Sequence, residues 1–445
     1  WYLTRQFHPD ERWIFGVVSQ LSYPEAPTGL QYGTFPMYVL AVIKDITAMF
    51  ASWFGHFDTN RFVIVAGRTL SGAFDVITLV LTYALGRRLR PGAEGRRLGL
   101  FAALLLAFAV LHIQMAHFFV VDVPLTTLVV ATLYATLNVV ERGRRRDYLA
   151  AGVLLGLAMA TKTSALPLAL AVGVAHLLGL QRAAAADRAR RWLDLGLGAV
   201  ASVAAFFAAM PHAFLDWSRF WANQNEQRRI LVTGEADVPY NRQYLNTAPF
   251  WYYAKNMIRY TLGWGLGAAG LTAFLAYPAA ALAATVRAWR RKRWHAWMQA
   301  AQDRAGLIVI GVFAVTYALV IGSSFAKFNR YVLPLVPLLC LLASAGGFDL
   351  LARIGGNLGR RVLRGVMAAV AAVTILWALA FAAIYTAEHP WIAASRWMLD
   401  NVPTDQYGAD DVLRPTRVVN EEWGDDLPVA VEGRGVGRYQ NRKFP

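Results

Sequence analysis

The chain has 445 residues, of which 57% are hydrophobic and 16% are charged, and its mean hydropathy is +0.37. A soluble domain usually carries about 25% charged residues, so the composition excludes an ordinary soluble protein and predicts an all-α polytopic membrane protein. The formal net charge of +16 resides in short clusters between apolar segments, which argues against a nucleic-acid-binding face.

The chain begins with polar and aromatic residues, 1–33, which predict a loop with short helices. Residues 34–56 are apolar but include Lys44 and Asp45, so an interfacial or re-entrant helix is favoured over a complete span. The chain begins at Trp1, without Met or a signal-like segment, and we expect a preceding span. Ten candidate spans follow: 61–86, 98–113, 124–140, 148–161, 164–180, 193–210, 259–286, 305–322, 331–350 and 365–386.

Positive charge alternates from one connection to the next and predicts the orientation of the chain. Five connections hold 23 of the 44 Lys and Arg, namely 87–97, 141–147, 181–191, 287–304 and 353–364, and these are predicted to be cytoplasmic. The intervening connections and the C-terminal segment then face the other side, here called outer. We therefore divide the chain into a first outer loop with its helix (1–60), a transmembrane domain (61–386, with the outer loop 211–258) and a small extracytoplasmic C-terminal domain (387–445).

Asp10 and Glu11 are adjacent acids in the first outer loop and are followed by Arg12. Ionised groups this close to a bilayer are costly and are usually functional. One interpretation is a catalytic carboxylate that removes the proton of an attacking hydroxyl, with its neighbour tuning it. The alternative is a solvated acid or a surface salt bridge to Arg12, worth about 0–1 kcal/mol.

A second acid, Asp122, lies at the start of a candidate span, just before Pro124. It is either the N-cap of that helix or a second acid of the same site. His117 lies five residues earlier, and a divalent metal held near His117 and Asp122 is a further alternative, although two candidate ligands are a weak signal.

Three cations lie on the predicted outer side, although positive charge is expected to concentrate on the cytoplasmic side. Lys162 occupies the tip of a short hairpin, and Lys327 and Arg330 precede Tyr331. Binding of a lipid phosphate is one interpretation, and snorkelling of Lys162 is the other. The aromatic residues of loop 211–258 are typical of an interfacial belt, and stacking of one or two of them on a sugar is the alternative.

These short motifs resemble the GT-C superfold of polyprenyl-phosphate-sugar-dependent glycosyltransferases, in particular the protein O-mannosyltransferase and aminoarabinose lipid A transferase group. The matching pieces are Asp10-Glu11, Asp122, the segment 156–164 that ends in Lys162-Thr163-Ser164, and the run from Lys327 to Pro337. The resemblance covers about residues 1–350. It implies a bundle of about ten to eleven transmembrane helices with helices in its outer loops.

The resemblance also implies an activity: inverting transfer of a monosaccharide from a polyprenyl-phosphate donor to a hydroxyl of a protein, lipid or glycan. Asp10 is then the general base, Glu11 assists it, and Asp122 is the second essential acid. The implied substrate contacts are Arg12, Lys162, Lys327, Arg330 and Tyr331. The enzyme is expected to be a multi-pass protein of the plasma membrane with its site on the outer face. A transporter or lipid flippase, or a non-catalytic subunit of a membrane complex, remains the alternative.

Overall fold

The computed structural model describes residues 5–27, 29–30, 32–54, 58–407, 413–421, 427–431, 434 and 439–444. Within these residues, eight helical segments are long and apolar enough to cross a membrane, and a ninth span counts if one bent pair is included. The eight are α3 (Thr59–Arg88), α6 (Asp122–Glu141), η1 with α8 (Thr163–Arg182), α9 (Ala185–Ala209), α13 (Gly263–Arg290), α15 (Ala305–Ser323), η5 with α16 (Asn329–Arg353) and α17 with η6 and α18 (Asn357–Asn401). The architecture confirms the predicted all-α polytopic membrane protein.

Each of the ten predicted spans falls on one of these segments, on the bent pair or on α7 (Arg145–Thr161). The bent pair is α4 (Gly92–Ala107) and α5 (Val110–Ala116), whose axes differ by 62°. The predicted span 331–350 begins in the 3-10 helix η5 (Asn329–Leu335) before α16 (Val336–Arg353). Pro334 and Pro337 lie at this transition, where each lacks an N–H that a regular helix would use.

Helix α6 lies at the centre of the bundle and is buried along almost its whole length, against α3, α7 and α8. Its side chains join the largest hydrophobic core, which also includes residues of α4, α15 and α16. Because α6 is rigid and enclosed, a polar side chain at its first residue has a fixed position. That residue is Asp122.

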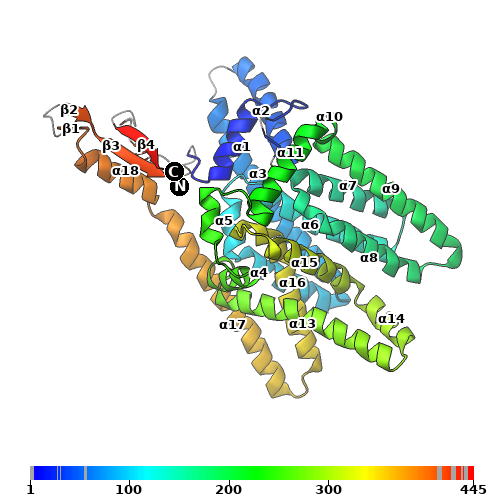
Figure 1. Cartoon of the computed structure of the whole chain (residues 1–445). Coiled ribbons are helices and arrows are strands. Elements are labelled where there is room, and N and C mark those ends of the chain that lie inside the picture. Colours follow the sequence, from blue (N-terminus) through cyan, green and yellow to red (C-terminus); the bar gives the residue numbers. More distant parts are fainter. Residues whose placement is uncertain are drawn as a thin grey trace.

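One end of the bundle carries most of the irregular structure, and we call it the site end. Figure 1 shows α1 (Pro9–Ser19), α2 (Phe35–Phe54), α10 (His212–Leu215) and α11 (Trp217–Gln227) gathered there, with α14 (Trp294–Asp303) at the opposite end. The remaining elements of loop 211–258 are η2 (Arg228–Thr233), η3 (Pro239–Tyr244) and α12 (Trp251–Asn256), and η4 (Met257–Thr261) follows them. Helix α2 coincides with the predicted interfacial helix and exposes apolar side chains along one face, including Val42, Ile46 and Met49.

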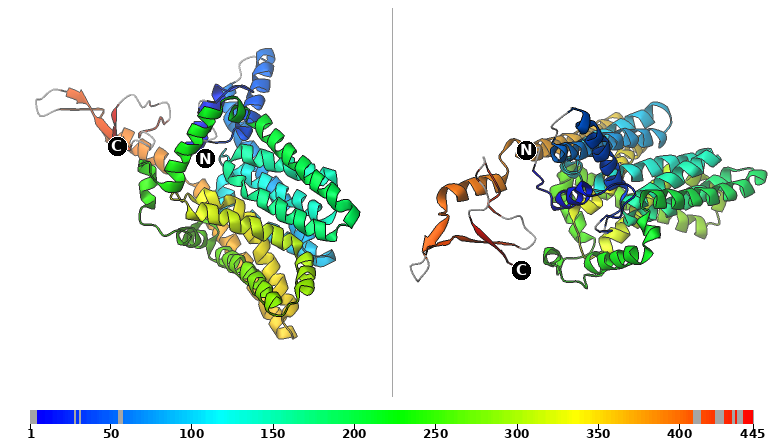
Figure 2. Two further views of the ribbon diagram at one scale, coloured as in Figure 1. Left: turned by 45° about the vertical axis from the view of Figure 1, so that its right-hand side comes forward. Right: turned by 90° about the horizontal axis from the view of Figure 1, so that it is seen from above.

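The C-terminal segment extends away from the bundle, as both views of Figure 2 show. Helix α18 (Pro390–Asn401) leads into two short sheets. Strands β1 (Asp405–Tyr407) and β2 (Leu413–Pro415) pair antiparallel, and β3 (Arg417–Glu421) and β4 (Gln440–Phe444) pair parallel. These strands were not predicted.

Candidate active site

Asp10 lies in the first turn of α1, where the local sequence fixes its direction. Pro9 occupies the first helical position, and the Nδ1 atom of His8 accepts a hydrogen bond from the Asp10 N–H at 3.2 Å, so that His8 is the N-cap. The Asp10 carboxylate faces Arg330, with 2.9 Å between Oδ2 and Nη2. Its side chain is 18% exposed, so this acid is reachable from outside the protein.

Asp122 is the first residue of α6 and its side chain is only 1% exposed. Its Oδ1 atom accepts a hydrogen bond from the Lys162 Nζ at 2.8 Å, and its Oδ2 atom lies 3.7 Å from the Arg330 Nε. The N-cap position belongs to Val121, so the alternative in which Asp122 merely caps its own helix is wrong. The carboxylate instead holds two cations from other segments.

Four side chains therefore form one row of alternating charge, which we call the charged row: Asp10, Arg330, Asp122 and Lys162. They come from α1, η5, α6 and the C-cap of α7, and together they are formally neutral. The row contains the two scarce acids and two of the three outward cations that the sequence singled out. Within the described residues, Asp122 Oδ2 and Arg330 Nε are buried without a hydrogen-bond partner, which leaves binding capacity at the middle of the row.

Aromatic rings form a wall behind the two cations. The Lys162 Nζ lies 4.2 Å from the centre of the Tyr331 ring, and the Arg330 guanidinium lies 4.5 Å from the Phe328 ring centre. Cations held against ring faces in this way keep their charge while they are partly removed from water. Tyr331, predicted as a substrate contact, thus packs against Lys162 and Arg330, two of the three predicted phosphate ligands.

Three further polar residues surround Asp10 and Arg330, although the sequence did not single them out as site residues. His8, Tyr32 and Tyr240 each interact electrostatically with both groups. Burial lowers the pKa of His8, partly offset by Asp10, so this imidazole is neutral at pH 7. Burial raises the pKa of Tyr32 and Tyr240, and the nearby Asp10 carboxylate raises both further, so both phenols remain hydrogen-bond donors. The position of His8 directly before Pro9-Asp10 could have identified it as a site residue from the sequence. No feature of the sequence around Tyr32 indicates that it lies near the site.

Glu11 points away from the charged row. It is fully buried, its two oxygens accept hydrogen bonds from Arg68 at 3.0 and 2.8 Å, and Oε1 also accepts the Phe119 N–H at 3.0 Å. These contacts tie α1 to α3 and to the loop before α6. Arg12 is exposed, and side chains two positions apart on a helix do not face each other, so Arg12 does not share the direction of Asp10.

Replacing Glu11 by Gln should destabilise the protein by about 3 kcal/mol, because Arg68 would lose the charge of its buried partner. The protein that remains folded should retain most of its activity. Thermal unfolding in detergent, together with turnover per folded molecule, measures both effects. The matched control is Asp187→Asn, which removes an exposed i,i+3 ion pair to Arg190 and should change stability by less than about 0.5 kcal/mol. Equal thermal stability of the two variants would contradict the anchoring role.

Gly33 brings the loop that carries Tyr32 directly onto the end of α7. Its N–H donates to the Thr161 carbonyl at 3.2 Å, one residue before Lys162. A Cβ at position 33 would overlap the backbone carbonyl of Ala160, so only glycine permits this approach. The loop therefore sets the distance between Tyr32 and the charged row.

Gly33→Ala should destabilise the protein by about 1–3 kcal/mol and reduce activity, because the loop must move away from α7. Gly16 offers an opposite control, since a Cβ there meets no atom within 4 Å and the position is helical. Gly16→Ala should therefore stabilise by about 0.5–1 kcal/mol. Melting temperatures of the two variants should move in opposite directions, and a shift of the same sign in both would refute the close-approach argument.

Lys327 and His117 do not join the charged row. Lys327 is buried and donates to the Phe325 carbonyl at 2.8 Å, and burial lowers its pKa. The His117 ring bonds to the Ile113 carbonyl at 2.7 Å and stacks on Tyr385 at 4.1 Å. Among the described residues, no group of three or more His, Cys, Asp or Glu side chains is arranged to hold a metal ion. The metal expected near His117 and Asp122 stays a prediction, and Asp122 is already engaged by Lys162.

The segment that joins α17 to α18 lies against the two segments that precede the acidic residues, the one before α1 and the one before α6. Phe7 stacks on His389 with 3.7 Å between ring centres, and His117 stacks on Tyr385. Elements of loop 211–258 pack on another side, where Tyr240 and Tyr244 contact the Phe328 ring. Trp217 and Trp221 of the same loop stack on each other and are exposed, as expected of an interfacial belt.

Comparison with known proteins agrees with this architecture. Residues 46–217 match the family model of dolichyl-phosphate-mannose-protein mannosyltransferases. The crystal structure of ArnT from Cupriavidus metallidurans bound to undecaprenyl phosphate is similar, with a TM-score of 0.54 and 17% identity over 85% of this chain and 72% of that one. The apo form of the same protein gives 0.50 and 16% over the same shares. No curated protein matches the sequence.

The chain thus has the GT-C fold, which confirms the fold implied by the sequence resemblance. The segment that matches the family model contains Asp122 and Lys162, whereas Asp10 and Arg330 lie outside it.

Proposed function

We propose that the protein is a membrane glycosyltransferase that moves a monosaccharide from a polyprenyl-phosphate donor to a hydroxyl acceptor. The observation that carries the proposal is Arg330, held between Asp10 at 2.9 Å and Asp122 at 3.7 Å. Transfer from a sugar phosphate needs a base for the acceptor and a cation for the leaving phosphate, and this arrangement supplies both side by side. The GT-C fold and the family match of residues 46–217 support the same reaction class.

Asp10 is the better candidate for the general base because it is the more accessible acid. Its side chain is 18% exposed, against 1% for Asp122, whose carboxylate is held by Lys162. Asp122 then serves to position the two cations. In this assignment Glu11 is a positioning residue that holds α1, and Arg12 and Lys327 have no direct role in the reaction.

The ion pair with Arg330 occupies the Asp10 carboxylate until substrate arrives. A donor phosphate carries the charge and geometry to bind the guanidinium, and it would replace Asp10 there. The freed carboxylate then takes the proton of the acceptor hydroxyl as its oxygen attacks the anomeric carbon. The bond from that carbon to the phosphate oxygen breaks with its electron pair on the phosphate, which Arg330 and Lys162 stabilise. A single displacement of this kind inverts the anomeric configuration.

The placement of the acids favours transfer over transport. Transporters usually carry their ion-coupling groups near the middle of the membrane on broken helices. Here Asp10 lies outside the candidate spans, and Asp122 is the first residue of one. Together with the distribution of positive charge, this supports a site at the outer membrane–water interface of the plasma membrane.

The proposal is tested by measuring release of polyprenyl phosphate, a product common to every acceptor. Purified protein in liposomes is given undecaprenyl-phosphate-linked mannose or aminoarabinose, with acceptor peptides, glycolipids or glycans. Wild-type protein should release the lipid phosphate and form the glycosylated acceptor, with the anomeric configuration inverted. Movement of donor between leaflets without any product would indicate a flippase and would reject the transferase assignment.

A further inference from the structure

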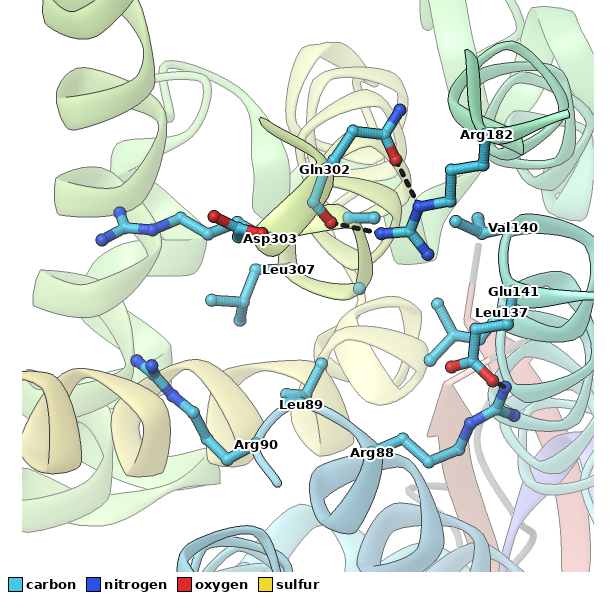
Figure 3. Close-up of a pocket in the computed structure, with 13 residues that line it drawn as sticks. Arg88, Leu89, Arg90, Leu137, Val140, Glu141, Arg182, Gln302, Asp303 and Leu307 are labelled. Carbon is cyan, nitrogen blue, oxygen red and sulfur yellow. Dashed lines mark hydrogen bonds and ion pairs between the residues drawn. The ribbon is translucent and has the colours of Figure 1, made fainter. Parts of the chain in front are cut away.

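Two neighbouring cavities meet at the opposite end of the bundle, and the reaction at Asp10 does not use them. The first lies between the turn from α3 to α4, the ends of α6 and α8, and the turn from α14 to α15, and has a volume of about 110 Å³. Figure 3 shows Arg88, Arg90 and Arg182 around it, with Glu141 and Asp303 as its carboxylates. The second cavity is larger, about 610 Å³, and the two share Arg304 as a lining residue.

The larger cavity is shaped for an apolar chain. It lies between α13, α16 and α17, where small residues such as Gly265, Ala269, Ala276 and Gly346 leave space between the helices. On α13 its lining runs from Trp264 to Ala280, which corresponds to about 24 Å along a helix. One leaflet supplies about half of the roughly 30 Å hydrocarbon thickness of a bilayer, so the cavity is long enough to hold an acyl chain that enters from one leaflet. The volume falls within the range of about 300–1,000 Å³ that is typical of ligand pockets.

Positive charge gathers at one end of this apolar cavity. Arg304 and Arg353 line it there, and both have exposed side chains. Neither forms an ion pair with a carboxylate in the part of the chain that the structure describes. Asp349 lines the same end but is already engaged by Arg90 and by the Tyr277 hydroxyl, the latter at 3.2 Å. Arg90, Arg304 and Arg353 all interact electrostatically with Tyr277, whose hydroxyl contacts the Asp349 carboxylate, so three guanidinium groups lie near one carboxylate.

We propose that this second cavity binds an anionic phospholipid in the leaflet opposite the charged row. Its acyl chain would occupy the space between α13, α16 and α17, and its phosphate would contact Arg304 and Arg353. The excess of guanidinium groups over carboxylates selects an anionic head group over a zwitterionic one, because a basic residue near the membrane surface contributes about 1 kcal/mol toward anionic lipid. The occupant would fill the gap between three helices and hold them together.

Lipid binding to purified, delipidated protein in detergent tests the proposal, with native mass spectrometry as the readout. The first phosphatidylglycerol should bind about tenfold more tightly than phosphatidylcholine, and it should raise the melting temperature. The double substitution Arg304→Gln with Arg353→Gln should remove this preference. The control double substitution is Arg361→Gln with Arg364→Gln, which changes exposed arginines on α17 that do not line the cavity. This control should keep the preference for phosphatidylglycerol.

A second pair of variants tests the apolar part without touching charge. Ala276→Leu fills the cavity and should weaken binding of both lipids, whereas Ala279→Leu alters an exposed alanine outside the lining and should not. Equal affinity of wild-type protein for the two lipids would overturn the proposal, as would an Ala276→Leu protein that binds phosphatidylglycerol normally. Displacement of phosphatidylglycerol by undecaprenyl phosphate at equal or lower concentration would assign the cavity to a polyprenyl lipid instead and would also overturn it.

Discussion

Replacing Asp10 by Asn should lower the rate of sugar transfer by about 100- to 10,000-fold, the contribution expected of a general base. Asparagine has nearly the same shape and can still accept a hydrogen bond from Arg330, so the local packing should survive. Arg330 also lies 3.7 Å from the Asp122 carboxylate, so its charge keeps an acidic partner after the change. The melting temperature and the affinity for undecaprenyl phosphate should therefore stay close to those of the wild-type protein.

Two comparisons make the Asp10 experiment specific. Asp237→Asn removes an exposed acid from the outer loop, where it pairs with Arg242 at 2.8 Å, and should leave turnover unchanged. Asp10→Glu keeps the charge but moves it by one methylene group, so partial activity is expected from it. Turnover of Asp10→Asn within threefold of wild type, measured as release of polyprenyl phosphate, would remove Asp10 from the reaction.

The sequence predicted the spans because each follows from a long apolar run that needs no distant partner. It also predicted that Asp10, Asp122, Lys162 and Arg330 would gather, since alternating positive charge placed all four on the same side of the membrane. The structure adds that the four side chains form one row, and it gives their order along that row. That order depends on which helix ends meet, and hydropathy does not encode it.

Other parts of the site depend on contacts between residues far apart in the chain. Glu11 was grouped with Asp10 because the two are adjacent, yet its partner is Arg68, 57 residues away on α3. Adjacent residues on a helix point about 100° apart, so the pair could not both face one cleft directly. Tyr32 reaches the site only through Gly33, whose packing on Ala160 is not visible in the local sequence. The four short strands after α18 likewise lacked a regular alternation that would have revealed them.

Asp122→Asn should be more damaging to the fold than Asp10→Asn, although the two acids contact the same arginine. Removing one partner of a buried ion pair typically costs about 3–5 kcal/mol, because the remaining charge is left without compensation. Asp122 is 1% exposed, and the Lys162 side chain that it holds is 17% exposed. We therefore expect a loss of about 3 kcal/mol in the free energy of unfolding, together with loss of transfer activity.

The double variant Asp122→Asn with Lys162→Gln separates the two consequences. Removing the orphaned cation should recover much of the lost stability, since the pair is then replaced by two neutral groups. Activity should not recover, because Lys162 is also needed to stabilise the departing phosphate. Asp194→Asn is the matched control: this acid is buried and paired with Arg145 at 2.8 Å, remote from the row. It should also destabilise the protein but should retain turnover per folded molecule. Full activity of the double variant would show that the charged row supports the fold alone, and that the phosphate is bound elsewhere.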